Sequence, residues 1–113
     1  MKVLVVEPLQ EPVAKEIDSS LEAMQKVVGG YIQALFPFDE PVALVCNEEG
    51  KLLGLPFNRA LLDENGKMYD IVTGTFFLCS APPDEENFCS LSDEQIERYS
   101  KLFQELELFL VEK

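Results

Sequence analysis

Apolar residues alternate or cluster along the chain in a way that predicts several short strands. Residues 2–6 form a β-branched apolar run that is typical of a strand, and residues 13–18 can return beside it as a hairpin. Residues 31–36 and 42–46 are two further apolar runs, each bounded on one side by a proline. The pattern therefore predicts four strands in this part of the chain.

Two other segments carry helix-start signals followed by apolar residues at spacings of three and four. In the first, Ser19 and Glu22 are spaced as a capping box, and Gly29-Gly30 ends the apolar stripe. In the second, Ser92 and Gln95 form the box. The stripe that follows this second box consists of Ile96, Tyr99, Phe103, Leu106 and Leu110. We expect one helix after each box.

The middle of the chain predicts a mixture of elements. Residues 51–55 can return antiparallel to residues 42–46, and residues 58–62 are expected to form one helical turn. Residues 69–78 predict a long strand in which Gly74 marks a bulge or a close backbone approach. The whole pattern indicates an α+β fold, with a mostly antiparallel sheet of about four to six strands and two helices packed on one face.

Composition narrows the class of protein. The chain has 113 residues, 47% of them apolar, which favours a single domain over residues 1–113. Twenty-one acidic residues against nine basic ones give a net charge of −12. Direct binding to nucleic acid is therefore not expected, because phosphate attraction needs clustered Lys and Arg.

Cofactor, metal and compartment expectations follow from residue usage. There is no histidine, and the three cysteines Cys46, Cys79 and Cys89 have no zinc-type spacing, so we expect reduced thiols, no metal and no cofactor. The N-terminal apolar run stops at Glu7 and Pro8, too early for a secretory signal. No apolar stretch is long enough for a membrane span. These features favour a cytoplasmic protein without a membrane partner.

Catalytic patterns are missing from the sequence. A Cys or Ser nucleophile needs a neighbouring base, and no spacing motif supplies one. The acid pairs Glu48-Glu49, Asp63-Glu64 and Asp84-Glu85-Glu86 all fall in predicted turns, where carboxylates are usually solvated. We therefore expect a protein that is not an enzyme.

Asn58 and Arg59 form one candidate binding site. A guanidinium fork can hold a carboxylate or phosphate through two hydrogen bonds, and the Asn58 amide can add a third. The alternative is structural, with Asn58 capping a helical turn and Arg59 pairing with a nearby carboxylate. Both interpretations remain open from sequence.

Acidic residues near the C-terminus form the other candidate site. Residues 84–113 contain nine acids and three bases, a higher charge density than in the rest of the chain. The candidate binding residues are Asp84, Glu85, Glu86, Glu94, Glu97 and Glu105. Such a face can present carboxylates much as a duplex presents phosphates, which would steer it to a basic groove. The alternative is ordinary solubility.

Four stretches together resemble a known family, the domain-of-unknown-function family DUF3846. They are residues 28–32 (VGGYI), 45–52 (VCNEEGKL), 54–59 (GLPFNR) and 70–77 (DIVTGTFF). The resemblance spans most of the chain and carries no established activity, so no catalytic residue follows from it. It implies a small protein encoded on phages, plasmids or integrative elements of Gram-positive bacteria.

Charge and resemblance together favour a non-enzymatic inhibitor from a mobile genetic element. Such a protein would bind the basic nucleic-acid-binding surface of a partner protein, a restriction or CRISPR effector, by mimicking DNA. One alternative is a module that binds a nucleotide or another small anion around Asn58, Arg59 and Gly74. Another is a structural or regulatory protein-interaction domain. The apolar residues 108–111 also allow a homodimer.

Overall fold

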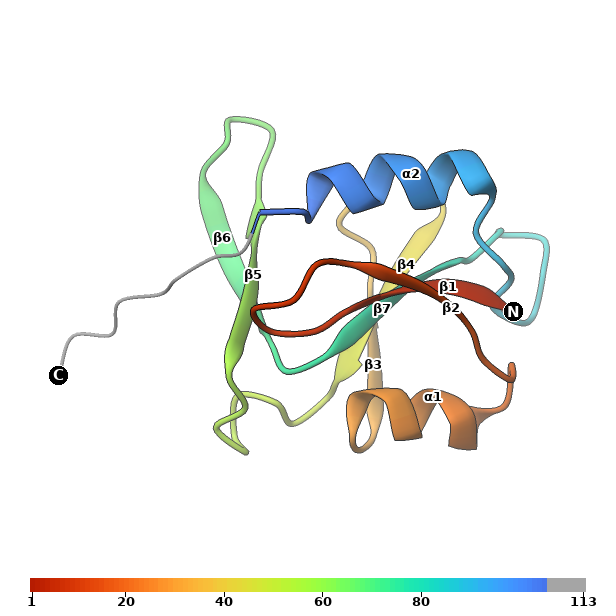
Figure 1. Ribbon diagram of the computed structural model, residues 1–113, viewed down its shortest axis with the longest axis horizontal. Coiled ribbons are helices and arrows are strands. Elements are labelled where there is room, and N and C mark those ends of the chain that lie inside the picture. Colours follow the sequence, from red (N-terminus) through yellow and green to blue (C-terminus); the bar gives the residue numbers. More distant parts are fainter. Residues whose placement is uncertain (106–113) are drawn as a thin grey trace, which may run out of the picture.

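The computed structural model describes residues 1–105, which form seven strands and two helices (Figure 1). In chain order the elements are β1 (Lys2–Val6), β2 (Val13–Glu16), α1 (Leu21–Val28), β3 (Ile32–Leu35), β4 (Val42–Asn47), β5 (Phe57–Leu62), β6 (Met68–Thr73), β7 (Phe76–Ser80) and α2 (Asp93–Leu102). The α+β class and the antiparallel pairing are confirmed. Leu106, Leu110 and the apolar residues 108–111 lie outside the described residues.

Five of the strands form one antiparallel sheet in the order β2-β1-β7-β4-β3. At its centre Leu78 of β7 pairs with Leu4 of β1 on one side and with Leu44 of β4 on the other. Every residue of β4 is buried, because both faces of this part of the sheet are covered. That double burial explains why residues 42–46 are continuously apolar rather than alternating.

The two helices cover opposite faces of this sheet, so the prediction that both pack on one face is wrong. Tyr99 of α2 packs into one apolar cluster with Leu4, whereas Met24 of α1 packs into a second cluster with Val5. Successive strand residues point to opposite faces, which is how Leu4 and Val5 reach different cores. Figure 1 shows α2 on one side of the sheet and α1 on the other.

Both helices begin at a serine whose side chain caps the first turn. Ser92 accepts the N–H of Gln95 through its side chain, and its own N–H donates to the Gln95 side chain, which confirms the predicted capping box. The first helix is capped one residue later than predicted, because Ser20 rather than Ser19 accepts the N–H of Ala23. With eight and ten residues, neither of these two helices in residues 1–105 is long and apolar enough to cross a membrane.

Strands β5 and β6 pair with each other as a two-stranded sheet, and this hairpin corrects three expectations. Residues 51–55 form turns rather than a strand, residues 58–62 belong to β5 rather than to a helical turn, and residues 69–78 are divided between β6 and β7. Each of these segments is a short apolar run whose periodicity does not decide between helix, strand and turn. Pairing with a distant segment decides it instead.

Gly74 is the point at which the chain leaves the hairpin and enters the main sheet. Its φ of 75° is left-handed, and a Cβ at this position would lie 2.7 Å from Cδ1 of Leu55. The predicted close approach to the backbone is therefore correct. The predicted bulge is not, because Gly74 lies between β6 and β7 and not within one strand.

The three cysteines are free thiols. Cys46 and Cys79 are buried, and Cys89 is partly buried. Burial raises the pKa of the Cys79 thiol to about 12. Cys79 is therefore a neutral packing residue of the core.

Candidate functional site

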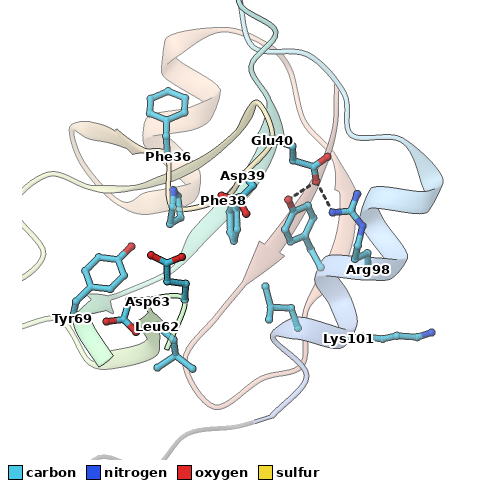
Figure 2. Close-up of a pocket in the computed structure, with 13 residues that line it drawn as sticks. Phe36, Phe38, Asp39, Glu40, Leu62, Asp63, Tyr69, Arg98 and Lys101 are labelled. Atoms are coloured by element: carbon cyan, nitrogen blue, oxygen red, sulfur yellow. Dashed lines mark hydrogen bonds and ion pairs between the residues drawn. The ribbon is translucent and has the colours of Figure 1, made fainter. Parts of the chain in front are cut away.

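An open groove of about 1070 Å³ lies between the loop of residues 36–40, the turn end of the β5–β6 hairpin and the C-terminal half of α2 (Figure 2). Its walls come from segments that are far apart in sequence. Phe36 and Phe38 belong to the loop, Tyr69 to the hairpin and Tyr99 to the helix. The groove is therefore a product of the tertiary fold.

Glu40 fastens the loop wall to the helix wall. Arg98 Nη1 donates to Glu40 Oε1 at 2.6 Å, and the Tyr99 hydroxyl donates to the same oxygen at 2.5 Å. Arg98 also donates to both carboxylate oxygens of Glu94, at 3.0 and 2.9 Å. The ring of Phe38 packs on that of Tyr99 with centroids 4.7 Å apart. These contacts, drawn in part in Figure 2, give the groove a preformed shape.

The pKa values of Glu40 and Tyr99 indicate that this contact holds the loop to the helix and does not act as a catalytic acid–base pair. The hydrogen bond from Arg98, followed by that from Tyr99, lowers the pKa of Glu40 from 4.5 to about 2. Burial and the bond to Glu40 raise the pKa of the Tyr99 hydroxyl. Neither group changes its protonation state near neutral pH, which a general acid or base would have to do.

Three further carboxylates line the groove without an ion-pair partner among residues 1–105. Asp39 and Glu64 are exposed, and so is Asp63, whose Oδ1 accepts the N–H groups of Asn65 and Lys67 at 2.9 Å each. These two bonds shape the hairpin turn. The loop wall and the hairpin wall are therefore negatively charged.

The groove also exposes large apolar side chains. Phe36, Leu62, Tyr69 and Leu102 line it and are exposed by 60%, 58%, 56% and 58%. Exposed apolar residues gathered at one site are typical of a binding surface, whereas scattered ones are not. Carboxylates and aromatic faces together suit a partner that is both cationic and partly apolar.

The structure places Asn58 and Arg59 inside the protein. Both are almost fully buried, at 0% and 1% exposure. Asn58 Nδ2 donates to the carbonyls of Val6 and Gly74 at 2.9 Å each, which ties the hairpin to the main sheet. Asn58 lies in β5, so the alternative in which it caps a helical turn is wrong.

The guanidinium of Arg59 donates to main-chain carbonyls. Its Nε and Nη2 both reach the carbonyl of Phe103 at 3.1 Å, and Nη2 reaches that of Gln10 at 2.7 Å. Its Nη1 donates to the Asn58 side chain at 2.8 Å. The fork that could hold an external anion thus joins β5 to the end of α2 and to the β1–β2 turn.

The acidic candidates do not form one surface, and none of them lines the groove. The groove is lined instead by Arg98 and Lys101, the cations that pair with Glu94 and Glu97. Glu94 and Glu97 are exposed on α2 but pair with Arg98 and Lys101, one turn further on. Glu105 is exposed beyond the end of α2. The exposed acids of residues 84–86 belong to the loop that leads into α2, at the opposite end of that helix from the groove (Figure 1).

The groove carboxylates are missing from the sequence-based candidates for a physical reason. The pair Asp63-Glu64 is expected from sequence to lie in a solvated turn, and it does. Glu40 meets Tyr99 across 59 positions of sequence, which no local spacing reveals. The available signal was the stretch Phe36-Pro37-Phe38-Asp39-Glu40, in which aromatic and acidic residues adjoin.

No group of three Cys, Asp or Glu side chains within the part of the chain that the structure describes is arranged to hold a metal ion. The groove therefore offers charge and apolar surface, with no set of metal ligands among these residues.

Comparison with known proteins gives a family and no activity. No curated protein and no solved structure matches the chain. Residues 1–104 match the family described as "Domain of unknown function (DUF3846)". That match covers nearly the whole chain and includes the four stretches quoted above. The chain belongs to the DUF3846 family, a domain of unknown function.

Proposed function

We propose that this protein is a non-enzymatic inhibitor encoded by a mobile genetic element, and that it binds a host defence nuclease at its basic nucleic-acid-binding surface. The partner would be a restriction or CRISPR effector in the cytoplasm. The groove carries the proposal, because it combines carboxylates outside any described ion pair with exposed aromatic side chains on a chain of net charge −12.

The chemistry of such a partner matches the groove. Surfaces that bind nucleic acid are rich in Arg and Lys, which contact phosphates along the strand. Carboxylates at Asp39, Asp63 and Glu64 can accept hydrogen bonds from these cations. The exposed faces of Phe36 and Tyr69 can stack on guanidinium groups. Long-range attraction between the two charged surfaces would accelerate their encounter.

The groove suits this role better than the exposed face of α2. Between Asp93 and Leu102 the helix carries three acids and two bases, giving −3 + 2 = −1. Asp93 is the one acid of α2 that does not pair with a base of the same helix, and it pairs with Lys2 at 2.8 Å instead. A nearly neutral helix face is a weak attractant, whereas the charged residues that line the groove from the loop and the hairpin are all acidic. They are Asp39, Glu40, Asp63 and Glu64.

The direct test is binding to a panel of purified restriction and CRISPR effectors at low and high salt. We expect one class of effector to bind, to lose affinity as salt rises, and to release its nucleic acid when the protein is added. Absence of binding across the panel, or tight binding that salt does not change, would contradict the proposal.

Two matched triple variants locate the contact. The first is Asp39→Asn, Asp63→Asn and Glu64→Gln; the second is Asp84→Asn, Glu85→Gln and Glu86→Gln. Each removes three charges, and the Asp63→Asn change keeps a side-chain oxygen to accept the turn hydrogen bonds. We expect only the first variant to lose binding. Equal losses would indicate general charge attraction, and loss in the second alone would place the contact on the loop before α2.

A further inference from the structure

A second and smaller pocket lies away from the groove, between β4, β6 and the loop of residues 47–55. Its volume is about 230 Å³. At roughly 30 Å³ for each water molecule, that volume holds about seven waters. The pocket is therefore large enough for a single heterocyclic ring and far too small for a nucleoside triphosphate.

The hydroxyl of a mostly buried threonine lies in the wall of this pocket. Thr73 is only 5% exposed and lines the pocket, yet its side chain makes no hydrogen bond to any of residues 1–105. Within those residues, no polar side-chain atom that is closed off from solvent lacks a partner, so this hydroxyl keeps some surface accessible to solvent. Thr73 lines both this pocket and a neighbouring one beside residues 54–57. A solvent-accessible hydroxyl that makes no hydrogen bond to the protein is available to a ligand.

Gly50 allows that hydroxyl to pack directly against the backbone. A Cβ at position 50 would lie far inside van der Waals contact with Oγ1 of Thr73. Any other residue at position 50 would therefore displace the Thr73 side chain. The glycine is explained by the hydroxyl next to it, since its backbone is not left-handed.

Lys51 and Asp70 place a donor and an acceptor side by side in the same pocket. Lys51 Nζ lies 2.5 Å from Asp70 Oδ1, and this oxygen also accepts the N–H of Ile71 at 2.8 Å. Asp70 Oδ2 has no partner among the described residues, and the ammonium has further N–H groups to donate. The hydrogen bond from Lys51 lowers the pKa of Asp70, which keeps it an acceptor.

The charge pattern selects the class of ligand. A free anion would be repelled by Asp70 and by Glu48, which also lines the pocket, and a free cation would be repelled by Lys51. A neutral molecule with an acceptor oxygen next to an N–H group satisfies both side chains at once. The lactam edge of a nucleobase such as uracil or hypoxanthine has this arrangement. Leu52, 88% exposed and lining the pocket, offers an apolar surface for a flat ring.

We propose that this pocket binds a free nucleobase through its lactam edge, with Lys51 donating to the carbonyl, Asp70 accepting the ring N–H and Thr73 bonding a second polar atom. The pocket binds without covalent chemistry. Cys46 lines it, but burial raises the pKa of this thiol to about 11, so it stays protonated. The inference does not depend on the proposed function of the groove.

The test is titration of the ¹⁵N-labelled protein with uracil, hypoxanthine and dimethyluracil, whose ring nitrogens are methylated and cannot donate. We expect the first two to shift the amide signals of residues 46–52 and 70–73, and dimethyluracil to shift none. Glycine and inorganic phosphate serve as probes for an amino-acid site or an anion site. Binding of either of these in place of the bases, equal binding of dimethyluracil, or no shifts with any base would overturn the proposal.

Substitutions identify the groups that recognise the base. Thr73→Val keeps the shape of the side chain and removes the hydroxyl, and we expect it to weaken uracil binding about tenfold. Asp70→Asn replaces one acceptor oxygen by a donor and should abolish the difference between uracil and dimethyluracil. Asp18→Asn makes the same chemical change at an exposed residue outside the pocket and the groove, and should leave uracil binding unchanged. Unaltered binding in both pocket variants, with folding verified by circular dichroism, would refute the assignment.

Discussion

Arg59 and Glu40 are both charged, but Arg59 is buried in the interior and Glu40 lies near the surface, and their roles differ accordingly. Arg59 is buried and donates to carbonyls from three parts of the chain, so it acts as a structural crosslink. Glu40 lies at the rim of the groove, and its carboxylate holds the loop against α2 through Arg98 and Tyr99. Removing the hydrogen-bond partner of a buried polar group lowers the stability of the fold far more than removing the partner of an exposed group.

Replacing Arg59 by alanine is expected to destabilise the fold strongly. The carbonyls of Phe103 and Gln10 and the Asn58 side chain would lose their donor, and a cavity would open beside them. We expect the free energy of unfolding in urea to fall by about 3 kcal/mol. Lys15→Ala, on the exposed strand β2, is the control and should change it by less than about 0.5 kcal/mol. A fully stable Arg59→Ala protein would show that the buried network is dispensable.

Glu40 is expected to make stability depend on pH in the acidic range. Its pKa of about 2 in the folded protein lies below the ordinary 4.5, so the unfolded chain binds more protons between these values. The contribution of Glu40 is therefore complete above pH 4.5 and is lost as the pH falls toward 2. Urea unfolding across this range should show a shallower pH dependence in Glu40→Gln than in the parent protein. Parallel curves would contradict the assignment.

At the scale of elements, Gly74 decides where one strand ends and the next begins. Its left-handed φ and its approach to Leu55 both require glycine. Gly54 has a similar φ of 68°, but no atom lies within 4 Å of the place that a Cβ would occupy there. A comparison of substitutions at the two positions therefore distinguishes the stability cost of backbone strain from that of steric contact.

We expect Gly74→Ala to cost more stability than Gly54→Ala. The exposed Gly54→Ala change should cost about 1 kcal/mol for the left-handed backbone alone. Gly74→Ala adds the clash with Leu55 at the junction of two strands, and should cost about 3 kcal/mol in total. Thermal and urea unfolding of both variants measure the difference. Equal losses would mean that Leu55 simply moves aside.

Elements with a local signal were predictable from sequence, and those fixed by distant pairing were not. Residues 2–6 and 42–46 are apolar enough to be strands in any context, and Ser92 carries its capping partner three residues away. Residues 58–62 became a strand only because β6 pairs with them. The two apolar helix stripes gave no information on which face of the sheet each would cover, since either face offers a similar apolar surface.

The binding regions were less predictable than the elements. The groove joins residues 36–40 to residues 98–102, and the small pocket joins Lys51, in the loop before β5, to Asp70 of β6. Arg59 was singled out because it is one of only two arginines, but its position in the interior depends on carbonyls supplied by Gln10 and Phe103. Rarity in a sequence does not show whether a side chain faces solvent.

At the scale of the whole molecule, the 21 acidic residues outnumber the nine basic ones, so ion pairs cannot give every carboxylate a cation. Each side-chain pair among residues 1–105 uses one of only nine bases. Repulsion between the remaining carboxylates therefore opposes the compact state. We expect added salt to raise the midpoint of thermal unfolding by a few degrees, because it screens this repulsion. A midpoint that falls with salt would show that the ion pairs outweigh it.

The β5–β6 hairpin interrupts what would otherwise be a simple connection between neighbouring strands, because β4 and β7 pair directly with each other in the main sheet. Asn58 and Arg59 anchor the base of the hairpin, while its turn carries Asp63 and Glu64 at the edge of the groove. Length and composition of this turn can therefore vary without disturbing either core. Relatives that exchange only these few residues would keep the scaffold and acquire a different binding preference.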